Sequence, residues 1–369
     1  MSVIPSDIVS YGSANMPEAD SATVGGALDT TKQVAWYDLS ANDTINAVSS
    51  SASDTATNLQ VMGRNAGGSV ATSSVATLNG TTPITNVGSL GTIERLLAAV
   101  ITGGAIAGLS NPVGTGAVGD IAVYRATAVL SARTAQTGSA NATGTTPALL
   151  KMQSGDGASV AIGQIIRITN NTPSGVNNQL RQIIAITGYG TDFVAVNRDW
   201  STVPDNTTQY SVFQGMLFAI LPNPVKAITR CFATSAADIP GGSSRTFYEK
   251  VFVVNNNTAT DLTTAQVEIA SDTPSLPGSA LLDIALTKVL NDTATAANRQ
   301  TLPANGDASA LTFVTQPAFV SVIASPGSLT FGSAPNAAGA QGVWLRLTLP
   351  AGTAAYKGAA TLRTQGNTT

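Results

Sequence analysis

The sequence predicts an all-β protein of several domains, each a small β-sandwich or β-barrel. Short apolar runs of about four to eight residues recur through the chain, separated by clusters of Gly, Pro, Asn and Asp. Successive runs start about 8–12 residues apart, which is typical of sandwiches and barrels. No helical period persists, and no repeat with a fixed period of about 20–50 residues is visible, which disfavours a helical bundle and a solenoid.

Residues 1–30 predict an extended N-terminal arm. Small apolar groups alternate there with Pro5, Gly12 and Pro17, so no helix or central strand continues for long. An arm with these apolar side chains is suited to ordering against a neighbouring subunit, and an arm that stays free in solution is the alternative. The candidate assembly-interface residues are Val3, Ile4, Ile8, Val9 and Met16.

Residues 31–130 predict a β-sandwich domain. Residues 58–62 alternate between polar and apolar side chains, as a half-buried strand does, and the Asn-Gly pair at 79–80 favours a tight hairpin turn. Residues 93–101 contain an acidic and a basic residue near their start, as a helix often does. Their β-branched content and the glycines that follow are equally compatible with a strand.

Two further domains are expected after a linker. Residues 131–147 are rich in Ser, Thr, Gly and Ala with Arg133 as their single charge, and they predict a linker or a long exposed loop. Residues 148–215 predict a small barrel or mini-sandwich of five short strands. Residues 216–369, which begin near a Pro-Asn-Pro hinge, predict an immunoglobulin-like β-sandwich of about seven strands without the Cys pair of antibody domains.

Charge is scarce in this chain. Only 11% of the 369 residues are charged and 43% are hydrophobic, whereas an ordinary soluble domain has roughly 25% charged residues. The surface must therefore be covered mainly by Ser, Thr, Asn, Gln, Gly and Ala. Uncharged hydroxyls and amides lose less hydration on burial than charged groups do, so the composition favours a protein that packs against other protein chains. A stable secreted β-protein is the alternative.

Several partner classes are disfavoured. With 18 basic residues, a net charge of −3 and no run of Lys or Arg, the chain lacks the phosphate-neutralising stripe of a nucleic-acid-binding protein. The first residues do not resemble a signal peptide, and the most apolar stretch, 96–109, is too short to span a membrane. Cys231 is the single cysteine, so no intrachain disulfide forms; we expect a buried side chain and folding in a reducing cytoplasm.

The residue inventory argues against catalysis. There is no histidine, which removes Ser-His-Asp and Cys-His catalysis and His-ligated zinc. The acidic residues are scattered and mostly stand beside turn residues, where Asp side chains bond to backbone N–H groups. We therefore expect no enzyme activity, catalytic residue, cofactor or metal site. Residues 114–119 match the dinucleotide pattern G-x-G-x-x-G, but an Asn-Pro pair precedes them and a β-rich run follows, so the strand–turn–helix context is missing.

Two kinds of ligand remain open. Calcium needs only oxygen ligands, which residues 255–257 with Asp261, or Asp199 with Asp205, could supply. Sugars stack on exposed Trp rings, although core packing is the commoner use of each tryptophan in this chain. The three tryptophans are Trp36, Trp200 and Trp344.

A series of short phrases resembles virion proteins of tailed bacteriophages. Between residues 179 and 213 an arginine (Arg181), an aliphatic strand, the pair Asp199-Trp200 and a Pro-Asp corner follow one another in the order of a module that recurs in such proteins. The opening and ending domains carry similar phrases. The phrases are Val48–Asp54, Thr77–Pro83, Glu94–Leu96, Gln179–Tyr210 and Gly342–Gly352.

The resemblance implies a structural component of a phage virion. A capsid decoration or cement protein is the leading role: a homo-oligomer that stabilises the shell through subunit–subunit contacts, with the major capsid protein as its expected partner. The protein would be located in the virion after assembly in the host bacterial cytoplasm, with neither nucleic acid nor membrane as a partner. A tail, collar or fibre protein is the alternative within the virion, and a glycan-binding or hydrolytic module is the alternative of another class.

Overall fold

The computed structural model divides the chain into two compact units. Unit 1 comprises Met1–Val3, Asp7–Trp36 and Arg230–Thr369, and unit 2 comprises Ile4–Ser6 and Tyr37–Thr229. The residues that the structure describes are 3, 7–16, 22–34, 39, 41–106, 108–140, 147–170, 178–186, 188–218, 225–228, 241–257, 259–269, 280–287, 293–303, 311–315, 322–323, 328–329, 339–352 and 362–368. Over these ranges the elements are strands apart from two short 3₁₀ turns, Val87–Ser89 and Asp156–Ser159, so the all-β prediction is confirmed.

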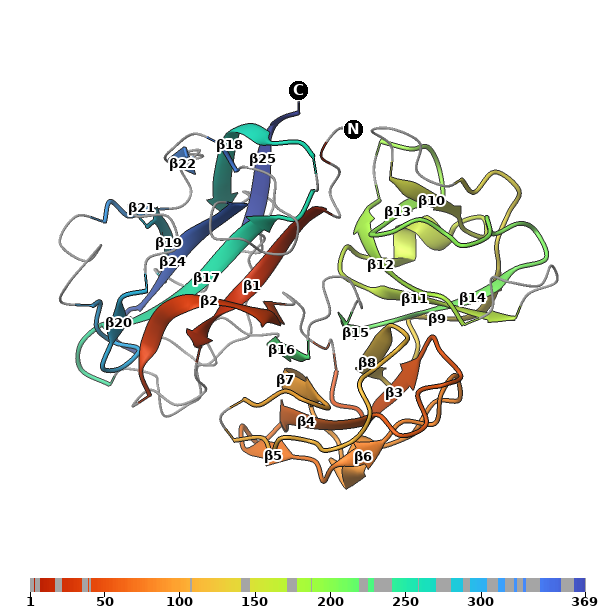
Figure 1. The fold of residues 1–369 in the computed structure, drawn as a ribbon, viewed down its shortest axis with the longest axis horizontal. Helices are drawn as coiled ribbons and strands as arrows, with labels where there is room; N and C mark the ends of the chain where they lie inside the picture. The colour runs from red at the N-terminus through yellow and green to blue at the C-terminus, as the bar shows by residue number, and fades with distance from the viewer. Residues whose placement is uncertain are drawn as a thin grey trace. The chain divides into compact units, whose positions relative to one another are not determined.

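The larger sheet of unit 1 is antiparallel and takes strands from both ends of the sequence (Figure 1). Its longest pairing joins β17 to β24, from Arg245 opposite Leu349 to Val254 opposite Ala340. The strand order is β21 (Val314–Thr315), β19 (Leu281–Leu286), β24 (Ala340–Leu349), β17 (Arg245–Asn255), β1 (Ile8–Asn15) and β2 (Val24–Val34), and β20 (Thr295–Ala296) pairs with β2.

The N-terminal segment differs from the expected extended arm. Residues 8–15 form β1, which pairs with β17 from Ile8 opposite Asn255 to Gly12 opposite Val251 and also pairs with β2. Tyr11 is fully buried in a cluster with Phe252 of β17. The arm expectation is therefore corrected for residues 8–15 and 24–30, because these residues belong to β1 and β2 and are paired within the sheet of unit 1.

A smaller sheet of unit 1 is built around β18 (Leu262–Ile269). The short strands β22 (Val322–Ile323) and β23 (Ser328–Leu329) pair with β18, and β25 (Leu362–Thr368) pairs with it as well. An immunoglobulin-like domain formed by residues 216–369 alone was expected. Unit 1 differs from this expectation, because β1 and β2, from the start of the chain, belong to its larger sheet.

Unit 2 contains two smaller sheets, each of which combines strands from before residue 130 with a strand from after residue 214. One has the order β16 (Lys226–Ile228), β7 (Arg95–Ile101), β4 (Asn58–Arg64) and β5 (Val70–Thr72), with β6 (Ala76–Thr77) also paired to β4. The other has the order β15 (Gly215–Phe218), β8 (Ile121–Arg125) and β3 (Ile45–Ser49). Residues 95–101, for which helix and strand were both open, form a strand because β4 and β16 pair with its two edges.

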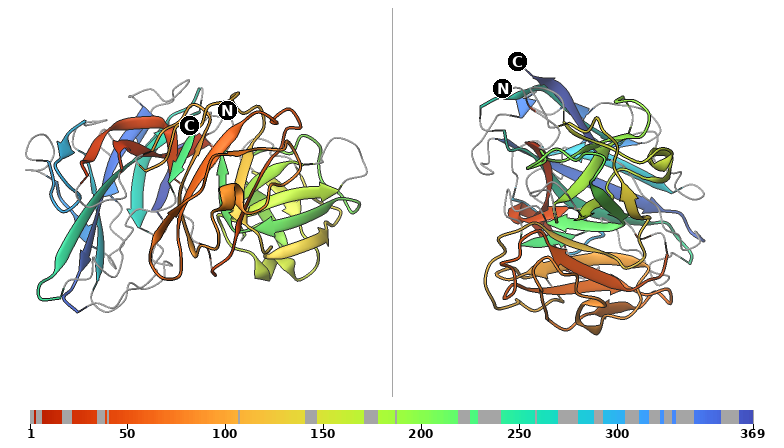
Figure 2. Two further views of the ribbon diagram at one scale, coloured as in Figure 1. Left: turned by 90° about the horizontal axis from the view of Figure 1, so that it is seen from below. Right: turned by 90° about the vertical axis from the view of Figure 1, so that its right-hand side faces the viewer.

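The rest of unit 2 is a curled six-stranded sheet, which Figure 2 shows from two further sides. Its two ends are joined by the segment after β9, in which Gln136 N donates to Lys151 O at 2.9 Å and Ala140 bridges to Leu149. The sheet therefore closes on itself as a small barrel. The strand order is β10 (Ala148–Lys151), β13 (Phe193–Val196), β12 (Leu180–Ala185), β11 (Ile165–Asn170), β14 (Gln209–Phe213) and β9 (Leu130–Thr134).

The barrel begins earlier in the sequence than expected. Residues 131–134, assigned above to a linker or exposed loop, belong to β9 and pair with β14. Leu130 at the start of β9 joins the barrel core, together with Trp200 and Tyr210. The linker expectation is corrected for residues 131–134, because their strand pairs with β14 in the sheet. The sequence did not indicate this strand, since only one of these four residues is apolar.

Tyr11 makes the stability of unit 1 sensitive to alkaline pH. Its hydroxyl accepts a hydrogen bond from Asn256 Nδ2 at 3.3 Å, and burial raises the pKa of Tyr11 to about 12. Unfolded tyrosine ionises near pH 10, so its contribution to stability is complete below about pH 10 and is lost as the pH rises through about 12. We expect Tyr11→Phe to reduce the decline of the unit 1 denaturation midpoint between these pH values, measured by urea titration. An unchanged decline would contradict this.

Candidate functional site

Charged side chains in both units form ion pairs with other side chains of the same chain. Among the residues that the structure describes, seven arginines lie within ion-pair distance of six carboxylates, and every one of these carboxylates except Asp43 is 8% exposed or less. Five of the six carboxylates are therefore largely withdrawn from solvent, whereas four of the arginines are 30–49% exposed. The pairs are Arg125–Asp43 (3.0 Å), Arg133–Asp156 (3.6 Å), Arg181–Asp120 (3.8 Å), Arg198–Asp120, Arg299–Glu249 (2.9 Å), Arg346–Asp283 (2.6 Å) and Arg363–Glu268.

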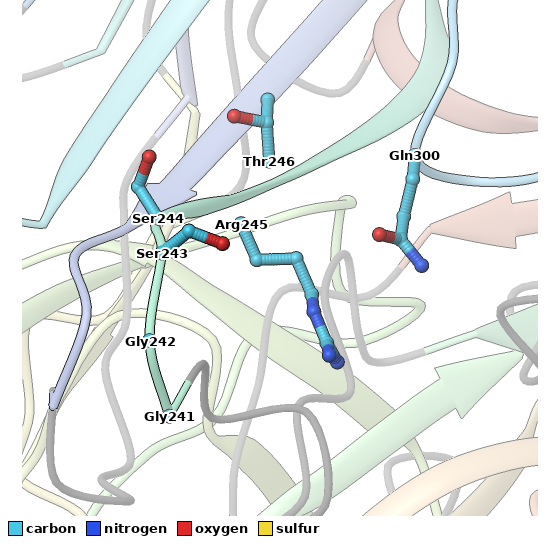
Figure 3. A pocket seen from close by; sticks show the side chains of 7 residues that line it. All are labelled: Gly241, Gly242, Ser243, Ser244, Arg245, Thr246 and Gln300. Atoms are coloured by element: carbon cyan, nitrogen blue, oxygen red, sulfur yellow. The ribbon is translucent and has the colours of Figure 1, made fainter.

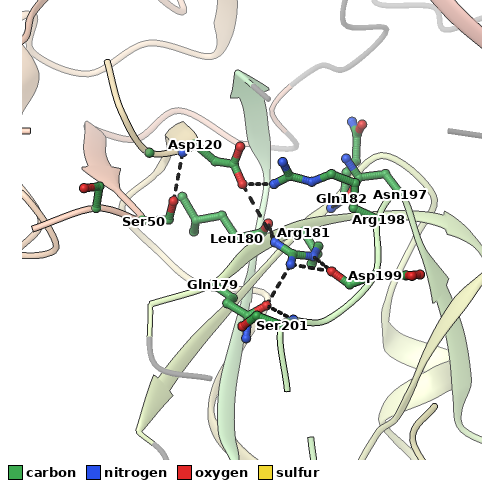
Figure 4. A network of polar contacts seen from close by, with 12 residues as sticks. Ser50, Asp120, Gln179, Leu180, Arg181, Gln182, Asn197, Arg198, Asp199 and Ser201 are labelled. Carbon is green, nitrogen blue, oxygen red and sulfur yellow. Dashed lines mark hydrogen bonds and ion pairs between the residues drawn. The ribbon is translucent and has the colours of Figure 1, made fainter. Parts of the chain in front are cut away.

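A network of polar contacts in unit 2 surrounds Arg181 of β12 (Figure 4). Its guanidinium donates to the backbone oxygen of Asp199 through Nε and Nη2, at 3.1 and 2.6 Å, and to Gln179 Oε1 at 2.7 Å. It also lies 5.3 Å from the centre of the Trp200 ring. Burial lowers the pKa of Arg181 to about 10. The guanidinium therefore loses hydration free energy on folding, and the hydrogen bonds of the network offset part of that loss.

Asp120 links this network to β8. Its carboxylate accepts from Arg198 Nη2 and lies 3.8 Å from Arg181 Nη1, while its backbone N–H donates to Ser50 Oγ at 2.8 Å. Arg181 and Arg198 belong to the barrel, and Asp120 immediately precedes β8, so the carboxylate connects two sheets of unit 2. The arginine and tryptophan that carry the phage resemblance are thus brought together, as a buried structural contact.

The Gly-rich loop at 114–119 already holds an anion of the protein itself. Asp54, which is 1% exposed, accepts hydrogen bonds from Val118 N at 2.8 Å, Gly119 N at 2.9 Å and Ser49 Oγ at 2.5 Å. A Cβ at Gly119 would lie 2.4 Å from Ser51 N, so glycine is required there for close approach. The strand β8 follows at Ile121. The loop is therefore a structural contact rather than a nucleotide site.

The Asp54 contact predicts a measurable loss of stability. Asp54→Ala leaves two backbone N–H groups and the Ser49 hydroxyl without their buried acceptor. Leaving buried polar groups unsatisfied costs about 1–3 kcal/mol. We expect a loss of about 2–3 kcal/mol from the free energy of unfolding of unit 2. Denaturant titration measures it, with Asp205→Ala in an exposed turn as the control. A loss no greater than that of the control would contradict the assignment.

The proposed calcium ligands are used in turns. Asn255 Oδ1 accepts from Asn257 N at 3.0 Å, and Asn257 Oδ1 accepts from the N–H groups of Ala259 and Thr260, at 2.9 and 2.8 Å. Asp205 Oδ1 accepts from Thr207 N at 2.8 Å. Among the described residues, no group of three or more acidic, cysteine or histidine side chains gathers in a way that could hold a metal ion.

Two of the tryptophans considered for sugar stacking lie in the core. Trp200 is 2% exposed, and its Nε1 donates to Leu149 O at 3.1 Å. Trp344 is fully buried in unit 1, where Lys250 Nζ lies 5.6 Å from its ring centre. Neither ring is available to a ligand. Trp36 and Cys231 lie outside the described residues.

The candidate assembly-interface residues do not form one outward apolar set. Ile8 and Val9 are half-buried in β1, and Val9 packs against the buried cluster around Tyr11. Met16 is 3% exposed. Val3 is half-buried, and Ile4 lies outside the described residues. At least part of this apolar surface is therefore used within unit 1.

Unit 1 has a polar hollow of about 350 Å³ at the start of β17 (Figure 3). Arg245 of β17 and Gln300, from another part of the chain, supply its longest polar side chains. Hydroxyls and glycine backbone make up the remainder, so the hollow is lined by hydrogen-bond donors and acceptors and by one positively charged side chain. Its lining residues are Gly241, Gly242, Ser243, Ser244, Arg245, Thr246 and Gln300.

Comparison with known proteins identifies no relative: no protein-family model, curated protein or solved structure matches the chain. No helix among the described residues is long and apolar enough to cross a membrane.

Proposed function

We propose that this protein is a structural component of a bacteriophage virion that works by packing against other protein chains. The observation that carries the proposal is the internal use of charge: five of the six paired carboxylates are nearly buried, as the pairs above show. The remaining surface is rich in uncharged hydroxyl and amide groups, which cost little to desolvate against a partner.

The specific role that we propose is a capsid decoration or cement protein acting as a homo-oligomer on the major capsid protein. It rests on the phrases that resemble phage virion proteins, and the clustering of Arg181, Asp199 and Trp200 in one buried contact supports a structural use of those residues. A tail, collar or fibre protein of the same virion is the alternative role.

Particle analysis tests both statements. Phage particles released from the host that carries the gene are purified by density gradient and examined by mass spectrometry and by immunogold labelling against this chain. We expect the chain in the particles at a fixed copy number, with gold on the head. Gold confined to the tail would favour the alternative role. A chain abundant in the lysate but absent from the particles would refute the virion proposal.

A second candidate, a glycan-binding module, has one observation in its favour: the polar hollow around Arg245 and Gln300. An Arg, an amide and several hydroxyls are suited to an acidic sugar, because they offer charge-assisted and neutral hydrogen bonds together. A glycan array separates the two candidates. Binding of acidic glycans that is lost in Arg245→Gln, but kept in the control Arg95→Gln, would favour the glycan module, and silence of the wild type would exclude it.

A further inference from the structure

The tetrapeptide Ser-Val-Ala-Thr occurs twice in succession, at 69–72 and 74–77, and both copies pair with the same strand. The first copy forms β5 and lies opposite residues 62–64 of β4, and the second forms β6 and lies opposite residues 58–59. Together they make the outer edge of the sheet β16–β7–β4–β5. Residues 69–77 are called the Ser-Val-Ala-Thr edge below.

Hydrogen bonds next to β5 fix which way its backbone groups point. Asn65 N donates to Ser69 O at 3.0 Å, and Ser73 N donates to Val61 O at 2.9 Å. Because bonded and non-bonded pairs alternate along antiparallel strands, Ala71 also directs its N–H and C=O toward β4. The backbone groups of Val70 and Thr72 therefore point away from the sheet.

The second copy repeats this arrangement. Leu78 N donates to Thr57 O at 2.9 Å, so by the same alternation Ala76 faces β4 while Thr77 directs its backbone groups outward. Val70 and Val75 also have the same exposed fraction, 45%. In both copies the alanine pairs with β4 and the threonine directs its backbone groups away from β4. Among the described residues, no strand pairs with the outer side of β5 or β6.

The kink between the copies is held in place by serine contacts. Val61 N donates to Ser73 Oγ at 3.0 Å, Ser73 Oγ donates to Ser74 O at 2.8 Å, and Ser74 N donates to Gly88 O at 2.9 Å. Gly88 has a φ of 50°, and a Cβ there would lie 2.0 Å from Ser74 O, so only glycine allows this contact. The edge is therefore a fixed feature of the sheet.

The Ser-Val-Ala-Thr edge consists of two short strands, and it has neither a charged residue nor a proline to oppose pairing with another strand. Monomeric proteins commonly place Lys, Pro or another charge on an exposed edge strand. Here no charged residue occurs between Arg64 and Glu94, and residues 69–77 contain no proline. An edge of this kind is suited to receive another strand through its backbone.

The sequence of the first copy favours an identical strand as that partner. Ser69-Val70-Ala71-Thr72-Ser73 is nearly symmetric about Ala71, so an antiparallel copy would place Val70 opposite Thr72 and Ser69 opposite Ser73. Pairs of β-branched residues stabilise neighbouring strands, and no like charges would meet. We propose that the Ser-Val-Ala-Thr edge pairs with the same edge of a second copy of this chain, about a two-fold axis through Ala71.

This inference rests on the proposed structural function and names the surface through which two copies associate. Sedimentation velocity of the full chain over a range of concentrations tests it. We expect a dimer for the wild type and a monomer for Val70→Lys/Thr72→Lys, because the added charges would face one another across the axis. Ile162→Lys, at a 58% exposed position of the barrel, is the matched control and is expected to remain dimeric.

A proline variant tests the backbone directly. The Val70 N–H points away from β4, so Val70→Pro removes a donor to the second copy and leaves the β4 pairing intact. We expect this variant to be folded by circular dichroism and monomeric. A monomeric wild type, or a dimer that persists in both edge variants, would overturn the proposal. Either of these outcomes would refute the proposed dimer surface and would leave the virion function untouched. Absence of the chain from phage particles would refute the virion function and would leave the dimer surface untouched.

Discussion

Replacing Asp120 with asparagine is expected to lower the free energy of unfolding of unit 2 by about 3–5 kcal/mol. The Asp120 side chain is 5% exposed and lies against two arginines, of which Arg181 is 8% exposed. Asparagine keeps the shape of the side chain but removes its charge, so the buried Arg181 guanidinium loses the carboxylate beside it and keeps only the charge of Asp199. Hydrogen exchange measured by mass spectrometry in denaturant assigns the loss to unit 2.

The companion variant for Asp120 is Arg198→Gln. Arg198 contacts the same carboxylate but is 30% exposed, so water replaces part of what is lost and we expect a penalty of about 1 kcal/mol. Equal penalties for the two variants would show that burial of Arg181 is not the origin of the effect. A penalty below about 1 kcal/mol for Asp120→Asn would contradict the account of the network.

The second large effect is expected at the buried pair of unit 1. Glu249 and Arg299 are 0% and 1% exposed, and their Oε1 and Nε atoms are 2.9 Å apart. Glu249→Gln leaves the arginine charge in the core without its carboxylate, and breaking such a pair costs about 3–5 kcal/mol. We expect a loss of this size for unit 1, measured by the same exchange experiment, with the stability of unit 2 unchanged.

A double variant separates the pair from its environment. Replacing both partners, as in Glu249→Leu/Arg299→Leu, removes both charges and both desolvation penalties, so a stability near that of the wild type is expected. A double variant as unstable as Glu249→Gln would show that packing around Arg299, which lies 5.8 Å from the Phe247 ring centre, matters more than charge.

Local patterns were sufficient to predict several strands. Residues 58–62 were expected as a half-buried strand and lie in β4, and the aliphatic strand expected directly after Arg181 is part of β12. In both cases aliphatic residues are concentrated over a strand length and bounded by turn residues. The all-β class followed from the same signal repeated along the chain.

Long-range pairings were not predictable in this way. Residues 8–15 contain Gly, Ser and Asn and lack a strong strand pattern, yet they pair with β17, more than two hundred residues later. Asp120 and Arg198 are 78 residues apart. A single sequence does not show which distant segments meet, so neither the pairing of β1 nor the burial of charge could be inferred from it.

The repeated Ser-Val-Ala-Thr copies show a different limit. The repeat is visible in the sequence, but its significance depends on the register opposite β4, which leaves Val70 and Val75 equally exposed. Register follows from the hydrogen-bond pattern and not from composition. The partner surface therefore became apparent only with the fold.

A cryo-electron microscopy reconstruction of the purified phage particle tests the central claim most directly. The account predicts that this chain is present on the head in a fixed number of copies, with the Ser-Val-Ala-Thr edge buried against a second copy. Particles that lack the chain, although the infected cell contains it, would contradict the claim that it is a structural protein of the virion.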